Sequence, residues 1–174
     1  MSSRISSYPG VEITPDDVKR ERYLVTKYQT DLDYTWSAGV ATGRFLKGLK
    51  EKEIWGRECD GCGRKLVPPR MYCEKSFRPT DRWVRLKDSG RVVTFSIAHV
   101  NFDASRRRQP IIVSVVEIGG ASPLMGILHL LGEVRPEDVR IGMQVEAVWK
   151  PDGRRTGAIT DIKYFRPVKR SKQS

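Results

Sequence analysis

Hydrophobic and polar residues alternate with the period of a helix before residue 50 of this chain and with the period of strands after residue 80. From residue 35 to about residue 49, apolar side chains recur every three or four positions, as at Ala41, Phe45 and Leu49. This spacing predicts an amphipathic helix. Three glycines within it weaken the helix in isolation, so it needs a surface to pack against. The pattern leaves open whether that surface is the chain's own next segment or another subunit.

A shorter helix is predicted to begin at Thr14 and to run to about Lys27. Thr14 can cap a helix, Pro15 fits the first turn, and the acids at positions 16 and 17 are favourable at the positive end of the helix dipole. The rest of residues 1–34 is polar and weakly patterned.

After residue 80 the chain shows short apolar runs with turn residues between them. We predict strands at 83–86, 91–100, 110–118, 124–131, 144–149 and 159–165. A loop at 101–109 and one helical turn at 136–139 lie between some of these strands. Short strands without a long helix are typical of a small closed barrel, and we expect a five-stranded barrel of the OB type. A four-stranded open sheet or another small barrel is the alternative.

All three cysteines lie in one short window, at Cys59, Cys62 and Cys73. Zn²⁺ prefers a tetrahedron of soft or borderline ligands, and a Cys-x-x-Cys spacing lets two sulfurs reach one ion. Gly61 and Gly63 are expected to supply the unusual backbone angles that such a turn needs. The window therefore predicts a rubredoxin-like zinc ribbon ahead of the barrel.

The fourth ligand is the difficulty, because Ser76 stands where a four-cysteine ribbon would have a thiolate. Three interpretations stay open. Zinc is held by three thiolates, with Ser76, a water or a nearby carboxylate completing the shell; the ribbon keeps its shape but has lost its metal; or the cysteines are ordinary buried thiols. No βαβ pattern surrounds the motif, which disfavours a redox Cys-x-x-Cys. No histidine lies near in sequence, so we interpret the site as structural.

Length and charge set the outer limits. A chain of 174 residues with 39% hydrophobic residues can bury one compact core and a small satellite. Residues 1–58 carry 10 Lys/Arg against 9 Asp/Glu, whereas residues 59–174 carry 22 against 12, so almost all of the net charge of +11 lies after residue 58. This field attracts polyanions, either nucleic acid or a phosphorylated small molecule such as coenzyme A. A solvated basic surface is the simpler interpretation.

Arg106, Arg107 and Arg108 form the densest basic cluster, in the predicted loop between two barrel strands. Fixed positive charge of this kind could meet the phosphates of coenzyme A, although a plain solvated loop explains it too. Arg154 and Arg155 have the same ambiguity.

Catalytic signatures are missing from the sequence. His99 and His129 each fall inside a predicted strand and are expected to be packed or edge residues. No Ser-His-Asp or Cys-His arrangement is visible, so no catalytic residues are expected in this chain.

The expected location is the cytoplasm. No apolar run approaches the length of a membrane span, and residues 1–9 lack the hydrophobic segment of a signal peptide. Cysteines kept as thiols for a metal agree with this location.

Three motifs together resemble a known family. The motifs are the segment Gly43–Lys50, the Cys-x-x-Cys-Gly window with Pro-Pro-Arg at 68–70, and the Thr-Phe-Ser strand within Gly90–Ser96. Together they are similar to motifs of the zinc-ribbon OB-fold proteins that accompany thiolase-type enzymes. The resemblance covers about residues 35–166. By resemblance, Cys59, Cys62 and Cys73 match three ribbon cysteines and Ser76 matches the fourth.

The resemblance implies a non-catalytic accessory subunit in a hetero-oligomer with a thiolase-like subunit. Such a subunit helps to hold acyl-CoA, while the catalytic residues lie on the partner. The sequence pattern itself predicts a helical arm at 1–54, a ribbon at 55–80, a barrel at 81–167 and a disordered basic tail at 168–174. A single-stranded nucleic-acid-binding module is the alternative function, since a basic barrel with a ribbon also suits single strands. An independent acyltransferase would show turnover by the isolated chain, and we expect none.

Overall fold

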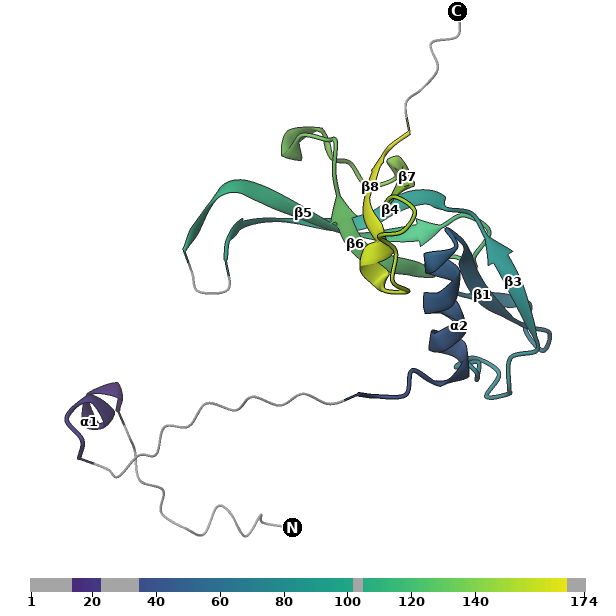
Figure 1. Ribbon diagram of the computed structural model, residues 1–174, viewed down its shortest axis with the longest axis horizontal. Coiled ribbons are helices and arrows are strands. Elements are labelled where there is room, and N and C mark those ends of the chain that lie inside the picture. Colours follow the sequence, from purple (N-terminus) through teal and green to yellow (C-terminus); the bar gives the residue numbers. More distant parts are fainter. Residues whose placement is uncertain (1–13, 23–34, 102–104, 169–174) are drawn as a thin grey trace, which may run out of the picture. The chain divides into compact units, whose positions relative to one another are not determined.

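The computed structural model describes residues 14–22, 35–101 and 105–168, and the chain divides into two compact units, 1–36 and 37–174 (Figure 1). The first unit contains helix α1 (Pro15–Lys19). Its predicted start is confirmed, because the Thr14 hydroxyl accepts a hydrogen bond from the Asp17 N–H and the Asp17 carboxylate accepts one from the Thr14 N–H. The helix ends at Lys19, earlier than predicted, and residues 23–27 of the prediction lie outside the described residues.

Helix α2 (Gly39–Lys50) confirms the second predicted helix. Its buried residues are Ala41, Phe45, Gly48 and Leu49, and it packs against strand β1 (Ile54–Cys59) and the short 3₁₀ helix η3 (Ile159–Asp161). The chain itself therefore covers the apolar stripe that the sequence left without an assigned surface.

Strand β1 is the centre of a three-stranded antiparallel sheet. It pairs with β2 (Arg64–Leu66) on one side and with β3 (Arg82–Leu86) on the other. The cysteine turn connects β1 to β2, and residues 67–81 connect β2 to β3. The predicted strand at 83–86 is therefore part of this sheet and does not enter the barrel.

Five further strands close into a barrel in the order β4-β5-β6-β8-β7. Neighbours in the barrel are antiparallel except for β6 and β8, which meet in parallel at Leu131 and Phe165. The strands span Ser89–Val100 (β4), Arg106–Ile118 (β5), Gly126–Leu131 (β6), Gln144–Trp149 (β7) and Ile162–Pro167 (β8). The mainly β architecture is thus confirmed.

The boundaries of several predicted strands were wrong. Residues 106–109 belong to β5 and not to a loop, because they continue the pairing with β4 as far as Val100↔Arg106. Strand β6 begins two residues later than predicted, since Leu124 has a positive φ of 63° and lies in a turn. The last predicted strand begins with the 3₁₀ turn η3.

One hydrophobic core joins the helix, the small sheet and the barrel. Phe45 and Leu49 of α2, Ile54 of β1 and Phe165 of β8 all belong to the same buried cluster. Cys59, Leu66 and Cys73 form a second, smaller cluster beneath the cysteine turn. Among the described helices, none combines the length and the apolar character needed to cross a bilayer.

Candidate metal centre

The structure brings all three cysteines to one point. Cys59 ends β1, Cys62 follows it in the turn, and Cys73 comes from the 67–81 connection. The three sulfur atoms lie within 4.8 Å of one another. The Sγ atoms of Cys62 and Cys73 are 3.5 Å apart, and the Ser76 Oγ lies 3.2 Å from the Cys59 Sγ. The four residues singled out in the sequence are therefore neighbours in space.

Backbone hydrogen bonds shape the first turn. The carbonyl of Cys59 accepts bonds from the N–H of Gly63 at 2.7 Å and of Cys62 at 3.3 Å. Gly63 has a φ of +68°, where a side chain would be strained, so its predicted role is confirmed. The expectation for Gly61 was wrong, because Gly61 is not among the positive-φ glycines and an added Cβ would meet only ordinary or slightly tight contacts.

A second turn carries Cys73 and Ser76. The carbonyl of Cys73 accepts a bond from the Phe77 N–H at 2.9 Å, and the Cys73 N–H donates to the Arg78 carbonyl at 2.9 Å. The two turns face each other, each contributing sulfur from a tightly bonded loop. This is the arrangement by which short loops hold a thiolate-bound metal.

The surroundings of the thiols differ. The Ser76 hydroxyl, followed by the backbone N–H groups of Ser76 and Lys75, lowers the pKa of Cys73 to about 6. A hydrogen bond from the Arg64 N–H lowers the pKa of Cys62, but burial and the neighbouring thiols of Cys73 and Cys59 outweigh it and the net pKa is raised. Cys73 is thus a thiolate at neutral pH, the form that binds metal.

The cluster fits a single tetrahedral ion. With zinc–sulfur bonds of about 2.3 Å, sulfurs at two corners of a tetrahedron lie about 3.8 Å apart. The observed separations, 3.5 Å between Cys62 and Cys73 and up to 4.8 Å within the trio, bracket this value. The Ser76 hydroxyl lies beside the trio, 3.2 Å from the sulfur of Cys59.

The nearby carboxylate of Glu74 is already engaged. Its two oxygens accept from Arg64 at 2.6 Å and from Arg70 at 3.1 Å. The pKa of Glu74 is lowered, first by its own backbone N–H and then, against the effect of burial, by the two arginines. Within the described chain, the metal-ligating groups gathered at this point are the three thiols.

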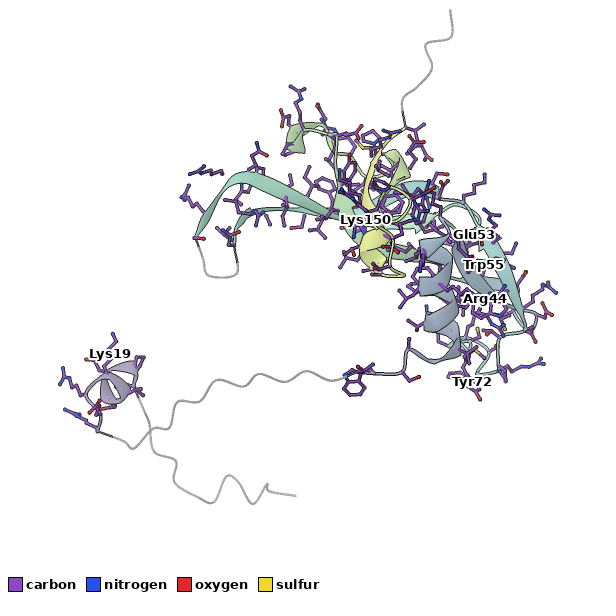
Figure 2. All side chains as sticks on the ribbon, viewed as in Figure 1. Lys19, Arg44, Glu53, Trp55, Tyr72 and Lys150 are labelled. Carbon is purple, nitrogen blue, oxygen red and sulfur yellow. The ribbon has the colours of Figure 1, made fainter. Side chains whose placement is uncertain are left out.

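A stack of arginines and tryptophans joins the sheet to α2. It was not predictable from the sequence, because its members come from three separate elements. The Arg44 guanidinium lies 4.6 Å from the Trp55 ring centroid and 4.7 Å from that of Trp83. Arg57 lies over the Trp83 ring at 4.8 Å. Figure 2 shows Arg44 and Trp55 together beside α2, with Glu53, whose carboxylate accepts from the Trp55 indole at 3.0 Å. Cation–π contacts of this kind fix the helix on the sheet.

The predicted basic sites lie elsewhere. Arg106, Arg107 and Arg108 are exposed on β5, outside the cysteine cluster. Arg155 is a structural residue: it donates to the Lys50 carbonyl at 2.6 Å and to the Lys150 carbonyl at 2.8 Å, and pairs with Asp152. Arg154 beside it is exposed.

The packed role expected for His129 is confirmed. Its Nδ1 accepts from the Leu130 N–H at 2.9 Å, which leaves Nε2 to donate to the Ile159 carbonyl at 3.3 Å. Burial lowers the pKa of this half-buried imidazole, against the effect of the two backbone bonds, so it is neutral at physiological pH. His99 is exposed on β4.

These features define a class of small mainly β proteins in which a cysteine-bearing sheet is joined to an OB-fold barrel. The family described as "ChsH2, C-terminal OB-fold domain" matches residues 83–150. A DUF35 domain-containing scaffold protein of Methanocaldococcus jannaschii is 34% identical over 130 residues, which are 72% of this chain and 89% of that protein. The chain therefore belongs to the DUF35 family.

Two solved structures share the fold. A DUF35-family protein of unknown function from Sulfolobus solfataricus is 25% identical, with a TM-score of 0.53 over 63% of this chain and 78% of that one. A chain of the Ltp2-ChsH2(DUF35) aldolase is 20% identical, with a TM-score of 0.53 over 73% of this chain and 94% of that one.

Proposed function

We propose that this chain is a non-catalytic accessory subunit of an acyl-CoA enzyme, built to bind and position a catalytic partner. The observation that carries the proposal is the display of large apolar side chains by the loop that bears Cys73. Phe77 is 87% exposed and Tyr72 67% exposed, and Met71 beside them is exposed too. Large exposed aromatic side chains on one loop favour a contact surface.

The backbone favours a binding role for this loop. Phe77 has a φ of +54°, which costs free energy for a bulky residue and persists only where the surroundings enforce it. The enforcing contacts are the Phe77 N–H bond to the Cys73 carbonyl and the cysteine cluster itself. The cluster therefore has a purpose beyond stability, since it holds an aromatic side chain out towards a partner.

Zinc is the ion that the donor set suits best, with Cys59, Cys62 and Cys73 as thiolate ligands and the Ser76 hydroxyl beside the fourth position. The ion would fasten the two turns together and supply no chemistry to a substrate. On this proposal the sheet of β1, β2 and β3 and its two turns form a zinc ribbon ahead of the barrel, which begins with β4 at Ser89.

The proposed partner is a thiolase-type subunit that carries the catalytic residues. The relatives support a partner-binding role, since one is named a scaffold protein and another is part of an aldolase with Ltp2. The extended N-terminus favours a degradative thiolase, and the small subunit of benzoylsuccinyl-CoA thiolase from anaerobic toluene breakdown is the specific candidate. The partner's acyl-CoA would be a shared ligand of the complex.

The test is co-production with a thiolase-type subunit from the same organism, followed by native mass spectrometry and zinc analysis of the purified sample. We expect a stoichiometric complex that contains zinc. Phe77→Ser is expected to weaken the complex, and Leu124→Ser is the matched control because Leu124 is 72% exposed on a different loop. A chain that stays alone, and binds no acyl-CoA or condensing enzyme, would overturn the proposal.

A further inference from the structure

Strand β5 continues past the end of the strand beside it. Residues Ile112–Glu117 of β5 pair with β6, whereas Ile111 and Arg106 pair only with β4 in the described part of the chain, on either side of an irregular stretch at 107–110. Figure 1 shows the β4–β5 hairpin running out beyond the barrel. One edge of β5 is therefore open from Arg106 to Ile111, and an open edge can pair with another extended chain.

A cavity lies where β6 ends and β5 continues, and we call it the β5 notch. It has a volume of about 390 Å³ and is lined mainly by apolar side chains, including Pro110, Ile112, Leu130, Leu131, Val134 and Tyr164. The polar groups at its rim already have partners: the Tyr164 hydroxyl donates to Glu133 at 2.7 Å, and Arg135 binds Asp138 at 2.7 Å. The notch thus presents apolar walls sized for one or two side chains.

The three arginines of β5 lie next to the notch, and the described part of the chain pairs none of them with a carboxylate. Gln109 lines both the notch and a second concavity formed with Arg106, Arg107 and Arg108. Arg82, Arg91 and Arg166 each bind a carboxylate. Among the described residues, no carboxylate lies within ion-pair distance of Arg106, Arg107 or Arg108, and Arg107 contacts only the side chain of Asn101 and the carbonyl of Gln109.

We propose that this open edge of β5 binds an extended acidic segment of a partner protein, with an apolar side chain of that segment in the β5 notch and its carboxylates on Arg106, Arg107 and Arg108. An exposed strand edge supplies main-chain pairing, and the alternate pockets supply specificity. Pro110 has no N–H, so pairing along this edge is short and side chains provide most of the selectivity. The site deepens the proposed accessory function and rests on it.

The same surface suits a nucleic acid less well. Single strands bind on platforms of exposed aromatic rings, and the one ring at the notch, Tyr164, is half-buried with its hydroxyl held by Glu133.

The experiment uses a short fluorescent peptide that carries one leucine beside alternating glutamate and valine residues, made in both sequence orders. Binding to the full chain is measured by anisotropy, and the site is mapped by amide chemical shifts in NMR. We expect the shifts to concentrate at residues 106–112 and 130–134. Arg108→Glu should weaken binding by about tenfold, whereas Arg154→Glu, a matched reversal of an exposed arginine on another loop, should leave it unchanged.

Control probes separate the contributions. Replacing the leucine by serine, or the glutamates by lysines, should abolish measurable binding. Equal binding of the lysine peptide, chemical shifts away from the β5 notch, or tighter binding of an oligothymidylate would overturn the site. A chain that ignores the peptide but still assembles with a thiolase-type subunit rejects the site alone, whereas a chain that binds the peptide but assembles with no enzyme rejects the accessory function.

Discussion

The hydroxyl oxygen of Ser76 lies 3.2 Å from the sulfur of Cys59, beside the cluster that Cys59, Cys62 and Cys73 form. The same hydroxyl lowers the pKa of Cys73 through a hydrogen bond. Ser76 therefore contacts the cluster directly, and a single oxygen-to-sulfur exchange would complete a set of four thiols.

We predict that Ser76→Cys raises zinc affinity by about tenfold or more, because it replaces a weak oxygen donor with a thiolate. Competition against a chromogenic chelator measures the change. Ser96→Cys is the matched control, since Ser96 is exposed on β4 away from the cluster. Equal zinc affinity in the Ser76→Cys variant and the wild type would contradict a metal centre at this point.

Removal of the metal should lower the melting temperature of the wild-type chain. Metal binding to the folded state adds its free energy to folding, and a chelator removes that contribution. The measurement is a thermal melt with and without a chelator. Cys73→Ser should melt at the same temperature in both conditions, because it has lost a ligand; a wild-type chain that is indifferent to the chelator would show that the thiols hold no stabilising ion.

The buried carboxylate of Asp161 should make stability depend on pH in the acid range. It accepts from the N–H groups of Thr156, Gly157 and Ala158 at 3.0, 2.7 and 3.2 Å. Burial acts to raise the pKa of Asp161, but these bonds and the charge of Lys150 outweigh it, so the pKa is lowered. The stabilisation is therefore fully present above the unfolded pKa of about 3.9 and is lost as the pH falls through the native pKa.

Asp161→Asn should cost about 1–3 kcal/mol of unfolding free energy at pH 7, because an amide oxygen replaces only part of the acceptor capacity. Urea denaturation at pH 7 and at pH 3 measures the difference between variant and wild type. The difference should shrink at the lower pH. A difference that is constant across this range would show that ionisation of Asp161 does not contribute.

Two glycines of α2 should respond in opposite ways to alanine. An added Cβ at Gly43 meets no atom within 4 Å, so Gly43→Ala should stabilise the chain by about 0.5–1 kcal/mol through helix propensity. At Gly48 the Cβ would lie 2.4 Å from the Trp55 ring and 2.9 Å from the Glu53 carbonyl, so Gly48→Ala should cost about 1–3 kcal/mol. Chemical denaturation of both variants checks the sign, and equal effects would contradict the packing of α2 on β1.

Replacement of the buried Arg57 by lysine should destabilise the chain by about 1–3 kcal/mol. Arg57 donates from Nε to the Thr80 hydroxyl at 2.9 Å and from Nη2 to the Thr80 carbonyl, and it stacks on Trp83. A lysine cannot reproduce this planar fork. Arg85→Lys is the control, because Arg85 is exposed and bound only to Glu53 among the described residues; an equal loss in both variants would refute a special role for Arg57.

Local chemistry explains why the cysteine cluster was predictable. Cys59 and Cys62 are separated by two residues, so one turn fixes their relation, and Gly63 marks the positive φ that closes it. The β4 and β7 strands and the α2 helix were also predictable from the sequence, because their apolar residues recur with the period of a strand or of a helix. Residues 23–27 of the first predicted helix and the basic tail after residue 168 lie outside the described residues.

By itself, the sequence determined the elements with strong periodicity, the cysteine cluster and the excess of positive charge after residue 58. Only the tertiary structure decided that β3 pairs with β1, that Arg106 to Arg108 extend a strand, and that Arg44 lies between Trp55 and Trp83. The physical reason is range: a turn or an amphipathic face depends on residues a few positions apart, whereas strand pairing and ring stacking depend on distant segments that pack together only when the whole core forms.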